Sequence, residues 1–193
     1  MSRMDVNPWE KKRKVMEEYD ESAALYDVRF NDEQTRKYET TLKMIRIAHN
    51  HMVLDAGCGT GLLIEHVAKL ARLIIGIDFS RQMIKLSKCK LYNLNNVELI
   101  RADVDYLPFR NRIFDQVFAI TLLQNLPEPI KSLKEISRVT KINGNLVVTG
   151  LKKNFTRRDF TKMMKKVGLE TIIFINRSEE LKDYIGIYKL GLI

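Results

Sequence analysis

From residue 51 onward, short apolar runs alternate with amphipathic segments, and this alternation constrains the fold more than any other feature of the chain. The strand-like runs cover residues 51–56, 73–78, 97–102, 115–123 and 145–151. The helical patterns cover residues 61–71, 80–93, 129–140 and 156–167. Strands that alternate with helices build βαβ units, in which helices cover both faces of a parallel sheet. The pattern therefore predicts a doubly wound α/β fold.

Two further apolar runs follow the last helical pattern, at residues 169–176 and 184–190. The polar link between them, RSEELKD, is too short for a crossover helix, so these two strands are expected to pair antiparallel. The sequence thus predicts a seven-stranded sheet that is mostly parallel and ends in a C-terminal antiparallel hairpin.

The charged segment before residue 50 has a helical pattern and predicts two helices, at about 9–24 and 31–48. No internal repeat, low-complexity tract or linker divides the chain. We therefore expect one domain over residues 1–193, with an N-terminal helical part, 1–48, followed by an α/β core, 51–193.

Composition and the first residues exclude several kinds of protein. With 45% hydrophobic and 30% charged residues, the chain is typical of a globular protein. No apolar run reaches the ~18 residues that a membrane-spanning helix needs, so no membrane association is expected. The first residues, MSRMDVNPWEKKRK, lack the apolar core of a secretory signal, which predicts a cytoplasmic protein. Cys58 and Cys89 have neither the number nor the spacing of a metal site or a disulfide framework, so no metal is expected.

Positive charge is concentrated in the last third of the chain. The net charge is +9, and residues 131–193 carry 14 Lys and Arg against 6 Asp and Glu. Residues 1–130 carry 19 Lys and Arg against 18 Asp and Glu, so nearly all of the positive excess is carboxy-terminal. The basic residues are densest in residues 152–166. Such asymmetry can mark an anionic partner such as RNA, or it can be the solvated face of a helix. Charge alone leaves both interpretations open.

A glycine-rich stretch, VLDAGCGTG, contains the end of the first predicted strand and the turn after it, at residues 53–61. In a doubly wound sheet a ligand lies outside the carboxyl ends of the strands, where the first strand gives way to its helix. Glycines at this place let the backbone bend sharply and approach a ligand closely. The phosphate-loop sequence GxxxxGK[ST] is absent, and GxGxxG fails because Leu62 and Ile64 stand where its third glycine belongs.

Acidic residues stand at the ends of three successive predicted strands: Asp55, Asp78 and Asp103. Asp55 would repel a pyrophosphate but attract an ammonium or sulfonium group. Asp78, 23 residues further on, is suitably placed to accept hydrogen bonds from both hydroxyls of a ribose. A ribose joined to a cationic amino-acid portion describes S-adenosylmethionine better than NAD or ATP.

Four stretches in this order, VLDAGCGTG, IGIDFS, RADVDYLPF and FDQVFAITLLQNLPEP, resemble successive motifs of the class I S-adenosylmethionine-dependent methyltransferases. Within that family they most resemble the methyltransferase type 11 branch, which includes quinone-biosynthesis C-methyltransferases. The resemblance extends from about residue 19 to residue 168. It implies a Rossmann-like fold, S-adenosylmethionine as the cofactor and S-adenosylhomocysteine as the product.

The resemblance also implies which positions bind the cofactor. The glycine stretch would pass under the methionine portion, while Asp55 would organise the ammonium group, directly or through water. Asp78 would hold the ribose hydroxyls, and Phe79 would pack on the adenine. The full set of expected cofactor-binding positions is Asp55, Gly57, Cys58, Gly59, Gly61, Asp78, Phe79, Asp103, Val104, Thr121 and Leu122.

The same resemblance assigns the remaining positions to the adenine edge and the methyl group. Asp103 would accept from the exocyclic amine, and the backbone N–H of Val104 would reach a ring nitrogen. Thr121, Leu122 and Gln124, at the end of the fourth predicted strand, would flank the methyl donor.

No catalytic residue is assigned from the sequence. A methyl group on a sulfonium is already activated, so the protein must chiefly align the reactants and exclude water. The candidates for a catalytic role are Gln124, Tyr26 and Glu128. Tyr19 and Tyr26 match the N-terminal lid helix of similar proteins, so the resemblance implies that the N-terminal helices form a lid.

The acceptor is less constrained than the cofactor. Lys152, Lys153, Arg157 and Arg158 follow the fifth predicted strand, at the same edge of the sheet as the expected site, and favour RNA, such as tRNA. A small molecule, quinone-like or another metabolite, is the alternative, and a non-catalytic S-adenosylmethionine-binding partner or sensor protein is a second one. Some similar methyltransferases require a small zinc-protein activator, so the resemblance includes such a subunit among the expected partners.

Overall fold

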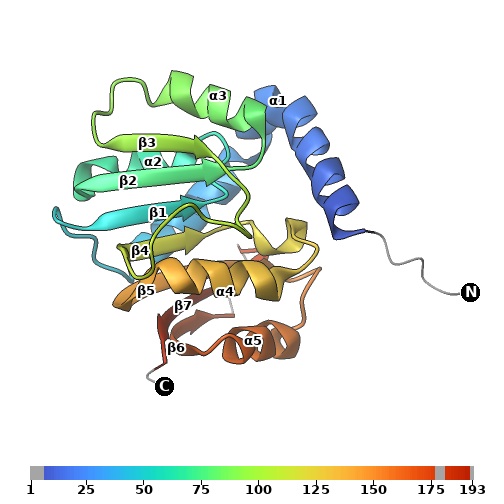
Figure 1. Cartoon of the computed structure of the whole chain (residues 1–193), viewed down its shortest axis with the longest axis vertical. Helices are drawn as coiled ribbons and strands as arrows, with labels where there is room; N and C mark the ends of the chain where they lie inside the picture. The colour runs from blue at the N-terminus through green and yellow to red at the C-terminus, as the bar shows by residue number, and fades with distance from the viewer. Residues whose placement is uncertain (1–6, 177–180, 192–193) are drawn as a thin grey trace, which may run out of the picture.

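The computed structural model describes residues 7–176 and 181–191, and in this part of the chain seven strands form one sheet (Figure 1). Their order across the sheet is β3-β2-β1-β4-β5-β7-β6. The strands are β1 Met52–Ala56, β2 Leu73–Asp78, β3 Val97–Arg101, β4 Phe114–Ala119, β5 Thr140–Leu151, β6 Leu169–Ile175 and β7 Asp183–Leu190. β1 to β5 run parallel, and β7 pairs antiparallel with both β5 and β6. The predicted Rossmann-like fold with a C-terminal antiparallel hairpin is confirmed. Residues 177–180, most of the predicted link between β6 and β7, lie outside the described residues.

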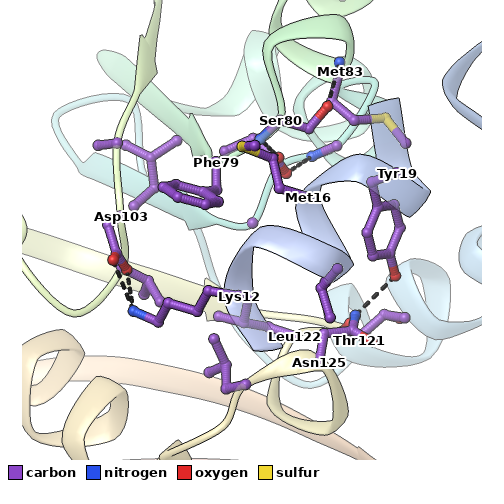
Figure 2. Close-up of a pocket in the computed structure, with 18 of the residues that line it drawn as sticks. Lys12, Met16, Tyr19, Phe79, Ser80, Met83, Asp103, Thr121, Leu122 and Asn125 are labelled. Carbon is purple, nitrogen blue, oxygen red and sulfur yellow. Dashed lines mark hydrogen bonds and ion pairs between the residues drawn. The ribbon is translucent and has the colours of Figure 1, made fainter. Parts of the chain in front are cut away.

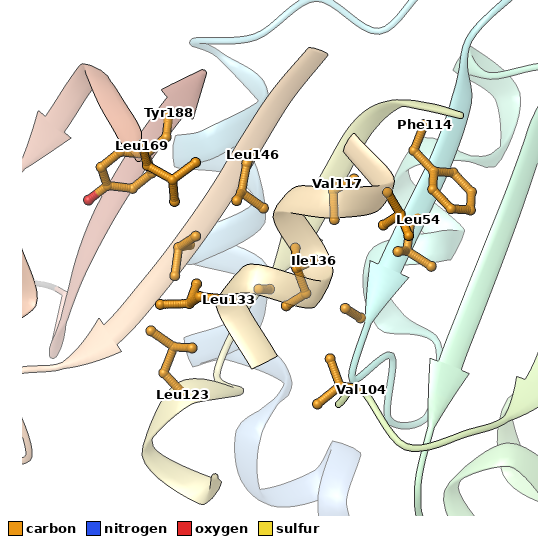
Figure 3. Close-up of a cluster of buried hydrophobic side chains, with 14 of the residues drawn as sticks. Leu54, Val104, Phe114, Val117, Leu123, Leu133, Ile136, Leu146, Leu169 and Tyr188 are labelled. Atoms are coloured by element: carbon orange, nitrogen blue, oxygen red, sulfur yellow. The ribbon is translucent and has the colours of Figure 1, made fainter. Parts of the chain in front are cut away.

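Helices cover both faces of this sheet (Figure 1). They are α1 Pro8–Leu42, α2 Leu62–Val67, α3 Arg81–Lys90, α4 Pro129–Val139 and α5 Arg157–Lys166, with the short 3₁₀ helices η1 Ala68–Leu70 and η2 Leu123–Asn125. On one face, Leu133 and Ile136 of α4 are buried in one apolar cluster with the sheet (Figure 3). Phe160 of α5 belongs to the same cluster. On the other face, Tyr38 of α1, Ile64 of α2 and Ile84 of α3 belong to a second cluster. None of the helices in the described part of the chain is long and apolar enough to cross a membrane.

The N-terminal segment forms one helix, α1, rather than the two that the pattern predicted. The side chain of Asn7 accepts a hydrogen bond from Trp9 N at 2.9 Å, and Pro8 occupies the first turn, which together start the helix. Residues 25–30, expected to separate two helices, contain neither Gly nor Pro, so nothing interrupts the backbone hydrogen bonds there. The first half of α1 lies beside the carboxyl ends of the strands, and the second half continues behind the sheet (Figure 1). One element therefore reaches both the edge of the sheet and the core.

Two strand boundaries also differ from the prediction. β4 ends at Ala119, although the apolar pattern predicted a strand as far as residue 123. Thr121 has a φ of +58°, in the left-handed region, which turns the chain out of the strand and into η2. β5 begins at Thr140 instead of residue 145, and its register against β4 shifts between Phe114 and Gln116. The early end of β4 places the loop that follows it across the carboxyl edge of the sheet.

Candidate cofactor and acceptor site

A cleft lies at the carboxyl ends of the strands, where the strand order reverses between β1 and β4 (Figure 2). It holds about 790 Å³ of space, including the solvent at its mouth. The glycine turn after β1 and the loop after β2 form its floor. The loops after β3 and β4 and the first half of α1 form its walls. A ligand crevice at this reversal is what a doubly wound sheet predicts.

The three glycines of the turn do different work. All have positive φ, at +83° for Gly57, +53° for Gly59 and +82° for Gly61, a region that disfavours residues with a Cβ. A Cβ on Gly57 would lie 3.0 Å from Leu122 Cδ1, and one on Gly61 would lie 2.6 Å from Ser87 Oγ in α3. A Cβ on Gly59 would meet no protein atom within 4 Å. Gly57 and Gly59 line the cleft, whereas Gly61 lies outside its lining and lets the turn approach Ser87 of α3 closely.

Asp78 ends β2 with its carboxylate held on both sides. Its Oδ2 accepts from Gly59 N at 2.9 Å, and its Oδ1 accepts from Ser80 N at 2.8 Å. Burial raises the pKa of Asp78, although these two backbone N–H groups act to lower it. Each carboxylate oxygen has a second lone pair beyond these bonds. The floor of the cleft therefore carries a fixed carboxylate that can accept further hydrogen bonds.

Asp55, at the end of β1, and Cys58, in the turn itself, are buried and are not among the residues that line the cleft. Asp55 is only 4% exposed, and burial, followed by the nearby Asp78, raises its pKa to about 8. Burial also raises the pKa of the Cys58 thiol well above its ordinary value, so the sulfur stays protonated. Both residues therefore lie outside the lining of the cleft, and their contact with the cofactor stays a prediction.

The first turns of α1 cover the end of the cleft that Phe79, Asp103 and Val104 line (Figure 2). The ring of Trp9 meets Phe79 edge to face, with ring centroids 5.8 Å apart. Lys12 Nζ lies 2.7 Å from both carboxylate oxygens of Asp103. The structure thus brings together the three residues expected at the adenine and adds two lid residues that were not predicted.

The opposite end of the cleft is formed by α1 and the loop after β4. Thr121 and Leu122 line it, as expected, together with Tyr19, Tyr26 and Asn125. Asn125 Nδ2 donates to the hydroxyl of Tyr19 at 2.8 Å, which joins the lid helix to the loop (Figure 2). Burial raises the pKa of Tyr26, so its phenol keeps its proton at neutral pH.

Two of the three catalytic candidates lie outside the cleft lining. Gln124 belongs to η2, and its Oε1 is buried without a hydrogen-bond partner among the described residues. Glu128 is exposed and immediately precedes α4. Tyr26 is the candidate that the structure places in the cleft. Asn125 was missed, although it follows Gln124 in the same polar turn of the sequence, whereas nothing in the charged N-terminal segment singled out Lys12.

The predicted basic residues do not form a single group. Lys152 Nζ donates to the backbone O of Leu181 at 2.7 Å and is partly buried. Arg157 and Arg158 instead share a shallow hollow on α5 with Lys162 and Lys165, which the sequence reasoning did not single out. Lys153 is exposed, like Arg157, Arg158, Lys162 and Lys165 on α5. Within the described residues, no ion pair or hydrogen bond joins Arg158, Lys162 or Lys165 to another side chain. The side chains of Arg157, Arg158, Lys162 and Lys165 are called the α5 basic face below.

Comparisons with known proteins identify the chain's family. A family profile described as "Methyltransferase domain" matches residues 54–148, from β1 into β5. The demethylmenaquinone methyltransferase of Clavibacter sepedonicus is 27% identical over 194 residues, which cover 96% of this chain and 78% of that protein. The chain belongs to the class I S-adenosylmethionine-dependent methyltransferases.

Solved structures with the same fold span nearly the whole chain. Magnesium protoporphyrin IX methyltransferase of Synechocystis PCC 6803, solved with bound S-adenosylmethionine, has a TM-score of 0.78 at 16% identity, covering 98% of this chain and 100% of that one. A chain from the complex between the Haloferax volcanii Trm112 methyltransferase activator and a methyltransferase has a TM-score of 0.79 at 15% identity. The match covers 93% of this chain and 98% of that one. At these identities the likeness shows the fold. The chain spans 45% to 78% of the length of the curated methyltransferases and other relatives that it matches.

The cleft fits the cofactor of the class I methyltransferases. Asp78 offers a carboxylate to a ribose, and the backbone at Gly59 is open on the side where a Cβ would project. Lys12 is the one Lys or Arg among the described lining residues, and it is already paired with Asp103. The carboxylates of the cleft would therefore repel phosphate groups, since no unpaired cation among these lining residues would offset them. The same carboxylates would attract a sulfonium or an ammonium group.

Proposed function

We propose that this chain transfers a methyl group from S-adenosylmethionine to an acceptor at the carboxyl edge of its sheet. The observation that carries the proposal is the carboxylate of Asp78, held between Gly59 N and Ser80 N at the floor of a cleft with a cation-poor lining. When bound, the cofactor supplies an electrophilic methyl group that needs no further activation. Asp78 would hold the ribose, while Gly57 and Gly59 would let the backbone lie against the methionine portion.

The remaining work of this chain would be alignment and exclusion of water. The lid helix α1 closes one side of the cleft through Lys12 and Tyr19. Thr121 and Leu122 would flank the methyl group. Tyr26, which keeps its proton, would donate a hydrogen bond to the acceptor rather than remove a proton from it.

A small apolar acceptor, quinone-like or another metabolite, is the class that the cleft supports best. Its acceptor end is lined by Tyr19, Ile120, Leu122 and Leu126, so a flat or aliphatic molecule could bury apolar surface there. Relatives named demethylmenaquinone methyltransferase support the same class.

Transfer of labelled methyl groups tests both the activity and the acceptor class. The protein is incubated with methyl-labelled S-adenosylmethionine and, separately, with lipid extract, RNA and protein extract. Label in the lipid extract is expected. Label in none of the fractions, with S-adenosylhomocysteine binding intact, would instead favour a non-catalytic partner or sensor.

RNA is the second candidate acceptor, and the α5 basic face is the observation that favours it. Its four exposed cations lie within ten residues on one helix, and none of them forms an ion pair within the described residues. Binding of RNA phosphates would displace counterions, so affinity would fall with salt with a log–log slope of about −0.7 per contact. Replacing the four residues by Gln should flatten that slope, whereas Lys85→Gln/Lys88→Gln on α3 should not. Salt-independent turnover would exclude this candidate.

A small activator protein is a further proposed partner. The support is the fold likeness, over 93% of this chain, to a protein solved in complex with the Trm112 methyltransferase activator. Co-purification with such an activator from the same organism, and a rise in methyl transfer when it is added, would test this partner.

A further inference from the structure

Thr121 is held in a backbone conformation that its side chain disfavours. Its φ is +58°, and a β-branched residue in the left-handed region is a genuine outlier. Such residues persist when the surrounding structure fixes them, and they cluster at functional sites. Thr121 lies directly in the cleft lining, just beyond the end of β4. The question is what holds it there.

Three separate elements hold the polar atoms of Thr121. Its backbone N donates to Thr149 Oγ1 of β5 at 2.8 Å, and its backbone O accepts from Asn125 Nδ2 of η2 at 3.0 Å. Its hydroxyl donates to Gln34 Oε1 of α1 at 3.0 Å and accepts from Lys37 Nζ, also of α1, at 3.1 Å. The lid helix thus supplies both partners of the Thr121 side chain.

Lys37 is an unusual partner because its side chain is almost completely buried. Its ammonium lies 2.8 Å from Asp183 Oδ2 at the start of β7 and 3.1 Å from Glu33 Oε1. Asp183 is buried as well, whereas Glu33 continues the network outward to the exposed Lys182 at 2.7 Å. A buried ion pair rarely adds stability beyond what well-packed apolar side chains would give. Stability is therefore a weak reason for burying the Lys37 ammonium. Its hydrogen bond to the Thr121 hydroxyl gives it a specific structural role instead.

We propose that Lys37 and Gln34 are positioning residues, which hold Thr121 in the left-handed conformation and so fix the cleft wall beside the methyl donor. Without them, the loop from residue 120 to residue 126 would relax toward more favourable backbone angles. The middle of the lid helix would then no longer be coupled to the wall of the site. The inference rests on the proposed methyl-transfer function for its consequence, but its structural part concerns the ligand-free protein alone.

The test uses variants that preserve volume. Lys37→Met/Asp183→Asn removes both buried charges together, so neither is left without its partner. Thr121→Gly removes the hydroxyl and accepts the positive φ without strain. Lys182→Met is the matched control, because it breaks the exposed end of the network without touching Thr121.

Amide hydrogen exchange of the ligand-free protein is the first measurement. In Lys37→Met/Asp183→Asn, peptides covering residues 119–126 are expected to exchange about tenfold faster than in the wild type, while peptides of α4 keep the wild-type rate. In the Lys182→Met control, peptides covering residues 119–126 should also keep the wild-type rate. Unchanged exchange in a folded variant overturns the proposal. This result does not depend on any cofactor, so it separates failure of the inference from failure of the proposed function.

Calorimetric affinity for S-adenosylhomocysteine is the second measurement. We expect about tenfold weaker binding for Lys37→Met/Asp183→Asn and no further loss when Thr121→Gly is added, because both act through the same residue. Fully additive losses would mean that Lys37 acts elsewhere and would overturn the proposal. If Lys37→Met/Asp183→Asn does not fold, Gln34→Leu takes its place. Its affinity is then compared, alone and combined with Thr121→Gly, in the same way.

Discussion

Lys12 Nζ lies 2.7 Å from both carboxylate oxygens of Asp103 and 2.5 Å from Asp105 Oδ2. This clasp joins the second turn of α1 to the loop after β3, across 91 residues of sequence. It occupies the carboxylate that the family resemblance assigns to the exocyclic amine of adenine. An adenine amine bound there would share these two oxygens with the Lys12 ammonium.

Lys12→Met is expected to bind S-adenosylhomocysteine about 1 kcal/mol more tightly, because the Asp103 carboxylate, no longer paired with an ammonium, would be a stronger acceptor for the amine. The thermal midpoint should fall, since Asp103 and Asp105 then lose a shared cation. Calorimetry and thermal unfolding measure the two effects. Arg13→Met is the control, because Arg13 is mostly exposed and contacts Glu17 only at 4.0 Å. Weaker binding by Lys12→Met would mean that the lysine completes the site instead of competing for it.

Gly59→Ala and Gly61→Ala should fail in different ways. Alanine at position 59 meets no protein atom, so the fold should survive apart from the strain of its positive φ, about 1–2 kcal/mol. Its Cβ lies at the cleft wall, and affinity for S-adenosylhomocysteine should drop by about tenfold or more. Alanine at position 61 would lie 2.6 Å from Ser87 Oγ and 2.7 Å from Leu91 Cδ1, so it should chiefly lower the thermal midpoint. Equal loss of stability in both variants would contradict the separate roles of Gly59 in cofactor binding and of Gly61 in packing.

The features that follow from local periodicity could be predicted from the sequence. The ends of parallel strands meet at one edge of a sheet, so Asp78 and Asp103 could be placed together from the apolar runs alone. The glycine turn was placed for the same reason. The family resemblance then added the expected neighbours of a known cofactor.

The features that depend on contacts between distant segments could not be predicted. Lys12 and Lys37 lie in a uniformly charged helical segment, and their partners Asp103 and Asp183 are far away in sequence. The turn at Thr121 was not predicted, because apolar residues continue past it and the pattern predicts a strand there. In each case a tertiary contact, rather than a local preference, decides the conformation.

Asp78→Ala is expected to weaken binding of S-adenosylhomocysteine by about 1.5–3 kcal/mol, because it removes charge-assisted hydrogen bonds to the ribose. It also leaves Gly59 N and Ser80 N without their acceptor, so thermal unfolding must be measured beside calorimetry. Asp115→Ala is the control, since Asp115 lies near the start of β4, at the opposite end of the sheet from the cleft, and accepts from Met52 N at 2.9 Å. That variant should lose stability but not affinity. Wild-type affinity in Asp78→Ala would place the ribose elsewhere.

Asp55 should make the folded protein less stable as the pH rises. Its pKa is about 8 in the folded chain, through burial and the nearby Asp78, against an ordinary value of 3.8 that the unfolded chain would show. Between these values the folded state binds more protons than the unfolded state, so the free energy of unfolding falls as the pH increases from about 4 to about 8. Asp55→Asn carries no charge at either pH and should lose this part of the dependence. Urea unfolding of the ligand-free proteins at about pH 6 and about pH 8.5 measures it, with the wild type losing more stability than the variant over this interval. Parallel losses in the two proteins would show that Asp55 is already ionised at the lower pH.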